Sequence, residues 1–364
     1  MPKAVAIREI EGKPGQVYYP SPRTNRRPRT PPRPNDLIIQ ISTAALNHRD
    51  LFIRQHLYPG TAFSVPLLAD GCGLVTATGP APTARSWLHK RVILNPGHGW
   101  KDSPSGPEDA AGYRILGGTT LHPVGTLQEV VCVDAGEVEE APAGLSDVEA
   151  GALPLTGLTA WRAVVTKSGN AVRGRNVLVT GIGGGVALMA LGFAVGMGVS
   201  VWVSSGDEEK IRRAREMGAR GGVNYRRVGW ERELREGLPR ERPFLDAIID
   251  GAGGDVVDKG AKLLKAGGVI VSYGMTTGPK LSYSMSAVLK NIELRGSTMG
   301  SRKEFHDMVE YVGKQQIHPV ISRVVHGLDN LKDIDDLFED MKSGSQFGKL
   351  VVQVSKEGDQ SKLI

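Results

Sequence analysis

A glycine-rich turn is the segment of the chain with the clearest chemical meaning. The apolar run NVLVT (176 to 180) leads directly into GIGGGV (181 to 186), and an apolar helical pattern follows. Glycines at such a strand-to-helix junction let the backbone approach a pyrophosphate, whose charge is met by the unpaired amides of the helix N-terminus. We therefore expect dinucleotide binding by Gly181, Gly183, Gly184, Gly185 and Val186, the last standing where a third glycine is usual.

The end of the next apolar run indicates which dinucleotide is bound. NAD-specific sites place an acid there, about 20 residues beyond the first glycine, to bind the ribose 2′-hydroxyl. Here the run ends in Ser204 and Ser205, and Lys210 follows. Small hydroxyls and a cation accommodate and attract a 2′-phosphate, which a carboxylate would repel. We therefore predict NADP(H), bound by these three residues; Tyr225 either covers the adenosine phosphate or only closes the third strand.

The elements that position these residues follow a regular alternation. From about residue 172 onward, an apolar run, a glycine turn and a helical pattern recur in that order. This alternation is typical of a doubly wound parallel sheet, that is, of a Rossmann domain. The strands are expected at 176–180, 200–204, 245–250 and 269–273, with helices from 185 to 197, over 207–217 and from 254.

The remainder of the chain has a different pattern. Short β-branched runs before residue 150 predict a mostly β region with strands at 37–41, 73–77, 90–94 and 127–133. Helical patterns at 303–314 and 328–342 and a strand-like run at 348–354 are too little for a further domain. We expect this last segment to fold back onto the first region.

Composition excludes several function classes. With 364 residues and only two cysteines, Cys72 and Cys132, the chain is not a disulfide-stapled scaffold, and we expect a cytoplasmic protein. The net charge of +6 is concentrated in the arginine- and proline-rich run 21–34, which argues against nucleic acid binding by the folded body. That run is expected to be a solvated loop, with a docking segment as the alternative. The longest apolar stretch is interrupted by glycines, so no membrane span is expected.

Several motifs, in this order and spacing, resemble the medium-chain dehydrogenase/reductase superfamily. The resemblance is strongest to its zinc-free quinone oxidoreductase-like branch and the zinc-type alcohol dehydrogenase-like subgroup. It implies a GroES-like catalytic domain in 1–154, a Rossmann NADP-binding domain in 155–298, and a return segment in 299–364 that completes the catalytic domain. The motifs are LNHRDLFIRQHLYPG (46 to 60), PLLADGCGLVTATG (66 to 79), GTLQEVVCV (125 to 133), LPLTGLTAWRAV (153 to 164), VLVTGIGGGVALMALGFA (177 to 194), VSSGDEEKIRRAREMGA (203 to 219), VIVSYGMTTGPK (269 to 280), LRGSTMGSRKEF (294 to 305) and FGKLVV (347 to 352).

The resemblance predicts no metal site. Zinc requires soft or imidazole ligands that converge on one point. The positions that hold zinc ligands in zinc-dependent relatives carry Asn47, Ala69-Asp70 and Leu155 here, and the stretch 95–121 has no cysteine for a structural zinc. His98 and His122 near that stretch are expected to be surface residues. Without a Lewis acid, an activated acceptor becomes the more plausible substrate.

The resemblance also assigns catalytic residues. Asn47 would lie close to the nicotinamide, and Tyr58 would donate the proton, a role suited to a neutral phenol. Alternatively, Tyr58 only lines the site and transfers no proton. Asp50 is expected to orient its neighbours rather than act as a base.

Further cofactor contacts are carried over from the superfamily. His48 either faces the pyrophosphate or lies at the surface, and Thr159 either packs on the nicotinamide or bonds its own helix. Gly251 and Tyr273-Gly274-Met275 end neighbouring strands, where a nicotinamide should lie. The remaining expected contacts are Thr298, Met299 and Lys349.

These residues lead to one main function and two alternatives. We expect an NADPH-dependent, zinc-independent oxidoreductase that reduces activated double bonds or quinones by hydride transfer. The first alternative is a metal-independent oxidoreductase of alcohols or carbonyl compounds, with an aldehyde as one candidate substrate. The second is a non-catalytic NADPH-binding protein. The segment 291–295 resembles the edge strand through which relatives pair, so a homodimer is expected.

Overall fold

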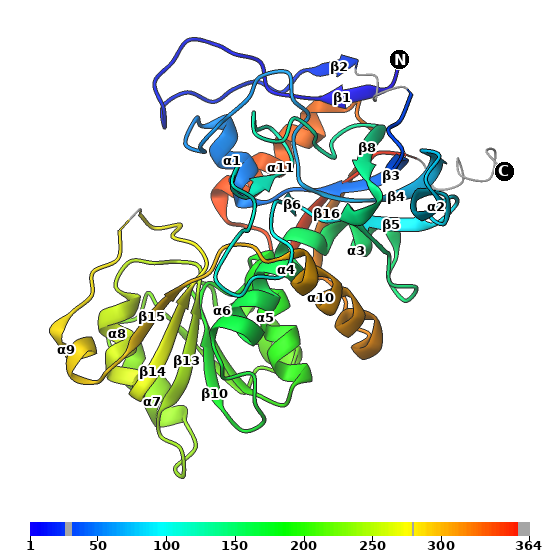
Figure 1. Ribbon diagram of the computed structural model, residues 1–364. Helices are drawn as coiled ribbons and strands as arrows, with labels where there is room; N and C mark the ends of the chain where they lie inside the picture. Colours follow the sequence, from blue (N-terminus) through cyan, green and yellow to red (C-terminus); the bar gives the residue numbers. More distant parts are fainter. Residues whose placement is uncertain (26–30, 279, 356–364) are drawn as a thin grey trace. The chain divides into compact units, whose positions relative to one another are not determined.

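The computed structural model describes residues 1–25, 31–278 and 280–355. It divides into two compact units (Figure 1). The first, here called the β-rich unit, consists of Met1–Leu155 and Ser301–Ile364, and the second, the parallel-sheet unit, of Thr156–Gly300. Arg26, Arg27 and Arg29 of the arginine-rich run lie outside the described residues.

The parallel-sheet unit contains a doubly wound sheet. Its strands have the order β12-β11-β10-β13-β14-β15, and each neighbouring pair is parallel. The chain thus winds outward in both directions from β10 and β13, which is the arrangement that creates a ligand site at the carboxyl ends of these two strands. The strands are β10 (Asn176–Val179), β11 (Ser200–Ser205), β12 (Gly221–Asn224), β13 (Leu245–Asp250), β14 (Leu264–Ser272) and β15 (Glu293–Gly296).

Helices cover this sheet, and their sequences reflect how far they are buried. Helix α5 (Gly185–Gly196) is almost entirely apolar and buries seven of its side chains, whereas α6 (Glu208–Glu216) is charged and buries only Ile211 and Ala214. One core cluster on the sheet is built around Leu178, Trp202 and Ile248. The other helices of the unit are α4 (Pro154–Trp161), which begins at its boundary, the π-helix η2 (Arg162–Lys167), α7 (Trp230–Gly237), α8 (Val256–Leu263) and α9 (Met285–Leu289).

A mostly antiparallel sheet forms the β-rich unit. The ten-residue strand β3 (Asp36–Ala45) lies at its centre and pairs with β4, β8 and β17. The other strands of this sheet are β4 (Asp70–Thr78), β5 (Arg91–Leu94), β8 (Val130–Asp134), β9 (Val138–Glu140), β16 (Ile321–His326) and β17 (Lys349–Gln353). Two separate two-stranded sheets are formed by β1 (Lys3–Val5) with β2 (Arg23–Asn25) and by β6 (Gly97–His98) with β7 (Arg114–Ile115). The helices are α1 (His48–Arg54), α2 (Pro82–Arg85), η1 (Ala135–Glu137), α3 (Asp147–Ala152), α10 (Arg302–Gln315) and α11 (Leu331–Ser343).

The segment from Ser301 onward belongs to this unit. Strand β17 pairs antiparallel with β3, with Val351 opposite Ala45, and Ala45, Ala152 and Val351 form a small buried cluster. Helix α10 begins at a capping box made by Ser301 and Glu304. A single sheet therefore joins residues from both ends of the chain.

Two predictions about local structure need correction. Part of the arginine-rich run is not a loop, because Arg23–Asn25 forms β2, paired antiparallel with β1 and anchored by an ion pair between Arg23 and Asp329. The strand expected from residue 127 begins only at Val130, since the amide of Leu127 donates to the carbonyl of Leu67 instead. Among the described helices, none combines the length and the apolarity that a membrane span requires.

Candidate functional site

The glycine turn has the backbone that a phosphate-binding loop requires. Gly181 and Gly183 adopt φ angles of 64° and 121°, and Gly184 is the N-cap of α5 without a side-chain cap. A Cβ at Gly183 would lie 2.8 Å from Cδ and 3.5 Å from Nζ of Lys210, so this lysine extends across the turn. Gly185 and Val186 form the first turn of α5, whose amides point toward the carboxyl end of β10.

Hydroxyl and cationic groups gather next to this turn, at the end of β11. Ser204 and Ser205 are buried, and the amide of Tyr225 donates to the Ser205 carbonyl at 3.0 Å. A Cβ at Gly206 would lie 2.7 Å from Nε of Arg226 and 2.9 Å from the Tyr225 hydroxyl. Partial burial lowers the pKa of Lys210; the charge of Asp207 opposes this effect, and the charge of Arg213 adds to it. We call Ser204, Ser205, Lys210, Tyr225 and Arg226 the cationic cradle.

At the carboxyl end of β13 lies a buried carboxylate. Asp250 accepts hydrogen bonds from the Thr180 hydroxyl at 2.6 Å and from the Gly253 amide at 2.9 Å. Desolvation raises the pKa of Asp250 despite these donors. The ring of Tyr273 packs against Gly251, where a Cβ would lie 2.5 Å from its hydroxyl, and burial followed by the charge of Asp250 raises the pKa of Tyr273.

Two of the remaining predicted cofactor residues of the parallel-sheet unit, Thr159 and Met299, are in contact. The Thr159 hydroxyl lies 3.6 Å from the sulfur of Met299, and both residues are buried. Gly274 and Met275 follow β14, and Thr298 follows β15 with an exposed side chain. Their contacts with a cofactor remain predictions.

A closed polar cluster joins three distant segments of the β-rich unit. Lys349 donates from Nζ to the Leu46 carbonyl, to Oδ1 of Asn47 and to Oδ2 of Asp70, each at 2.7 Å. Asn47 donates from Nδ2 to Oδ2 of Asp70 at 2.9 Å, and the Leu155 amide donates to Oδ1 of Asp70 at 2.6 Å. The three ionic or amide side chains are at most 6% exposed. We call Asn47, Asp70 and Lys349 the buried ionic cluster.

Arg49 connects this cluster with Tyr58. Asn47 caps α1 together with Asp50, whose carboxylate accepts a hydrogen bond from the backbone N–H of Asn47 at 2.8 Å. Arg49 lies 3.2 Å from Asp50, donates to the Gly117 carbonyl at 2.9 Å, and places its guanidinium 4.7 Å from the centre of the Tyr58 ring. Burial raises the pKa of Asp50 to about 6, and the charge of Arg49 offsets only part of this effect. His48, the first residue of α1, has an exposed side chain.

These residues do not fit a zinc ion. The positions that the resemblance matches to zinc ligands supply an amide, a carboxylate already paired with an ammonium, and a leucine, with neither thiolate nor imidazole among them. Across 1–25, 31–278 and 280–355, no group of three or more His, Cys, Asp or Glu residues is arranged to hold a metal.

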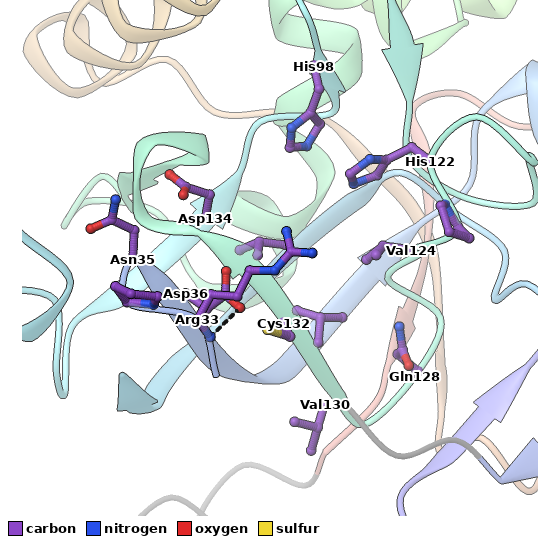
Figure 2. A pocket seen from close by; sticks show the side chains of 14 residues that line it. Arg33, Asn35, Asp36, His98, His122, Val124, Gln128, Val130, Cys132 and Asp134 are labelled. Atoms are coloured by element: carbon purple, nitrogen blue, oxygen red, sulfur yellow. Dashed lines mark hydrogen bonds between the residues drawn. The ribbon is translucent and has the colours of Figure 1, made fainter. Parts of the chain in front are cut away.

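A pocket of about 740 Å³ lies elsewhere in the β-rich unit, against β8 (Figure 2). The rings of His98 and His122 stack at one end of it, with centroids 4.2 Å apart, and the Arg33 side chain extends into it. His98 is 12% exposed and lies 3.3 Å from Glu137, and His122 is likewise only partly exposed. Burial, followed by the charges of His98 and Arg114, lowers the pKa of His122 to about 4.

Two residues of the site were missed by sequence reasoning. Arg226 could have been found, because it directly follows Tyr225 at the end of the strand beside β11. Arg49 had no comparable signal, because its contacts with Gly117 and Tyr58 come from segments that only the fold brings together. The pairing of Asp70 with Lys349 spans 279 positions of the sequence.

Comparison with known proteins identifies the family. The family model described as "Alcohol dehydrogenase GroES-like domain" matches residues 33–143, and that described as "Zinc-binding dehydrogenase" matches residues 185–314. The chain is 51% identical over 359 residues, 97% of its length and 100% of the relative's, to the zinc-type alcohol dehydrogenase-like protein YogA of Leptosphaeria maculans.

Solved structures agree with this assignment. A structure titled NAD-dependent alcohol dehydrogenase has a TM-score of 0.82 at 29% identity and covers 97% of this chain and 100% of its own. The crotonyl-CoA carboxylase/reductase AntE in complex with NADP has a TM-score of 0.80, with 97% and 94% coverage, but at 19% identity it shows the fold alone. The chain belongs to the medium-chain dehydrogenase/reductase superfamily and is an oxidoreductase with a GroES-like and a Rossmann-like part, as predicted.

Proposed function

We propose that this oxidoreductase uses NADPH to reduce an activated carbon-carbon double bond or a quinone, without a metal ion. The buried ionic cluster is the observation that carries the choice of reaction. At two of the positions that the resemblance matches to zinc ligands it puts the Asn47 amide and the Asp70 carboxylate, both already bound to the Lys349 ammonium. Simple alcohols and ketones gain most from a Lewis acid, whereas an enone or quinone already delocalises the charge that forms on reduction.

The cationic cradle supports the choice of NADPH. Lys210 and Arg226 provide two positive charges and Ser204 and Ser205 provide hydroxyls beside the glycine turn, where a 2′-phosphate needs charge-assisted hydrogen bonds. Two acids of this region are engaged in other contacts: Asp207 caps α6 by accepting from the Glu209 amide, and Glu208 accepts hydrogen bonds from Asn224 and Arg227. A carboxylate facing the ribose, which NAD-specific sites require, does not occur at the end of β11.

Bound NADPH would supply a hydride to the electron-poor carbon of the acceptor, and the electron pair of the double bond would move to the carbonyl oxygen. The protein must then hold the acceptor and provide a proton. Tyr58 is the proposed donor, since a phenol carries its proton at pH 7. Arg49, held by the Gly117 carbonyl and by Asp50, packs on the Tyr58 ring and restricts its position.

The test is a turnover assay that follows NADPH absorbance with a panel of enones and quinones, in the presence and absence of EDTA. We expect saturable oxidation of NADPH that is unchanged by the chelator. Replacing Tyr58 by Phe should lower kcat at least tenfold and leave the Kd of NADPH unchanged, because only proton transfer is affected. Phe52→Leu, a neighbouring aromatic change on α1, is the matched control.

Each alternative function predicts another result. Turnover of simple alcohols with NADP in the presence of EDTA would favour a metal-independent alcohol oxidoreductase. Tight binding of NADPH without turnover of any acceptor would leave a cofactor-binding protein. A rate that disappears with EDTA and returns with zinc would refute the proposed metal-free reaction.

A further inference from the structure

The three acceptors around Lys349 form a cation site made of oxygen atoms. The Leu46 carbonyl, Oδ1 of Asn47 and Oδ2 of Asp70 each lie 2.7 Å from Nζ. An ammonium has three hydrogens, so each has one acceptor and none is left for another partner. A lysine in this state cannot also donate to a cofactor phosphate without giving up one of these bonds.

The topology of the sheet explains how these groups meet. Strand β3 lies between β17 and β4, with Ala45 paired to both Val351 and Asp70. Lys349 begins β17, Asp70 begins β4, and Leu46 and Asn47 directly follow the end of β3. The lysine side chain therefore reaches past the end of the central strand to the neighbouring one.

Electrostatics favour one of the two possible orientations of the Asn47 side-chain amide. Its oxygen faces the Lys349 ammonium and its NH₂ group faces the Asp70 carboxylate. Rotating the amide by 180° would place NH₂ against a cation and oxygen against an anion, both in a site shielded from water, where such contacts are costly. The ion pair thus determines the orientation of an amide that the superfamily resemblance places near the nicotinamide.

We propose that the Lys349 ammonium is a covalently tethered cation that occupies this oxygen site in place of a metal ion. It neutralises Asp70, keeps divalent cations out, and acts as a positioning residue for the Asn47 amide. This role replaces the direct cofactor contact that the resemblance implies for Lys349. Only its consequence for turnover rests on the proposed function.

The first test asks whether the site accepts another cation once the ammonium is gone. Lys349→Ala leaves a carboxylate, an amide oxygen and a carbonyl oxygen around an opening, a set of hard ligands that suits Mn²⁺ or Mg²⁺ better than zinc. We expect one Mn²⁺ per chain, counted by electron paramagnetic resonance, and a saturable rise in Tm. Wild type and Lys349→Ala/Asp70→Asn should show neither. The proposal is overturned if Lys349→Ala binds no Mn²⁺, or if the wild type binds Mn²⁺ equally well.

The second test separates positioning from mere charge compensation. Lys349→Met and Asp70→Asn each leave one buried charge unpaired, so each should lower Tm by about 10 °C, while the double variant should recover most of this loss. If Lys349 positions Asn47, kcat of the double variant stays roughly tenfold low despite the recovered Tm, and the Kd of NADPH is unchanged. Lys332→Met, which removes an exposed lysine paired with Asp336, is the matched control.

Two results would overturn the positioning role of Lys349. Recovery of kcat together with Tm in the double variant would show that the pair only compensates charge. A weaker Kd of NADPH in Lys349→Met would restore the direct cofactor contact. If the wild type itself turns over no acceptor, the proposed function fails, but the Mn²⁺ and Tm measurements still decide the cation site.

Discussion

At the scale of single residues, this protein brings charged and polar side chains together in two places with opposite character. The cationic cradle places Lys210 and Arg226 beside the buried hydroxyl residues Ser204 and Ser205, an arrangement suited to an anion. The buried ionic cluster and the neighbouring pair of Arg49 and Asp50 instead match each cation with an anion. The first arrangement is suited to binding, and the second to holding other groups in place.

The cradle leads to a prediction about cofactor selectivity. Arg226→Ala removes a cation that lies against Gly206, and Lys210→Ala removes the one that crosses the glycine turn. Each should weaken NADPH binding roughly 10- to 100-fold, because a hydrogen bond to a charged group contributes about 1.5–3 kcal/mol. Arg226→Ala should change NADH binding little, since NADH lacks the 2′-phosphate. Titration of both cofactors by fluorescence measures this, with Arg232→Ala, a mostly exposed arginine of α7, as the control.

Asp50 leads to a prediction about pH. Its pKa in the folded protein is about 6, above the ordinary value of 3.8, so between these values the folded chain holds a proton that the unfolded chain lacks. The contribution of Asp50 to stability therefore rises as pH falls through this window, and is lost as pH rises through about 6. The free energy of unfolding of the wild type minus that of Asp50→Asn should increase by up to about 3 kcal/mol from pH 7 to pH 4. Urea unfolding at several pH values measures it, and a difference independent of pH would contradict the prediction.

At the scale of elements, the junction between β10 and α5 requires a glycine for conformational reasons. Gly183 has a φ of 121°, a backbone conformation that a residue with a side chain rarely adopts, and Lys210 lies over it. In contrast, Gly313 lies inside α10, where a Cβ would make only an ordinary contact of 3.9 Å with Pro142. The same residue type is thus required in one element and incidental in the other.

This contrast is testable with a matched pair of substitutions. Gly183→Ala should cost about 1–3 kcal/mol of stability through backbone strain and should weaken NADPH binding at least tenfold, because the turn must shift. Gly313→Ala should leave NADPH binding unchanged and add up to about 1 kcal/mol of stability, since alanine favours a helix. Thermal unfolding and a cofactor titration measure both effects. Equal behaviour of the two variants would refute the proposed role of the turn.

At the scale of the whole molecule, the edge of the parallel sheet remains open. Strand β15 ends the sheet, and its Leu294 is 38% exposed. The preceding helix α9 exposes Met285 at 67% and Leu289 at 78%. An uncovered edge strand beside exposed apolar side chains is typical of a surface that pairs with another chain.

We therefore expect a homodimer formed through this edge. Replacing Leu289 and Leu294 by Glu should halve the mass measured by light scattering at micromolar concentration, because two like charges would be brought into each apolar contact. Leu121→Glu, at a side chain of the β-rich unit that is 61% exposed, is the control and should leave the mass unchanged. A wild type that is already monomeric would refute the dimer.

The sequence by itself determined the features that depend on local pattern. The alternation of apolar strand, glycine turn and helix predicted the parallel sheet from β10 to β14, because such periodicities follow from the geometry of each element alone. Ser204, Ser205 and Lys210 were proposed as cofactor contacts on the same kind of evidence, since they lie at a fixed spacing from the turn. The superfamily was likewise predicted and confirmed.

Only the tertiary structure decided which charges are paired. Lys349 has acceptors 279 and 302 positions away, and the pairing exists because β17 and β4 flank the end of β3. His98 and His122 stack because strand β6 meets the segment that carries His122, and β2 forms because β1 is there to pair with it. The physical reason is common to all three: the energy of a charge, a ring or a backbone amide depends on the neighbours that folding supplies, whereas the period of an element depends on its own residues.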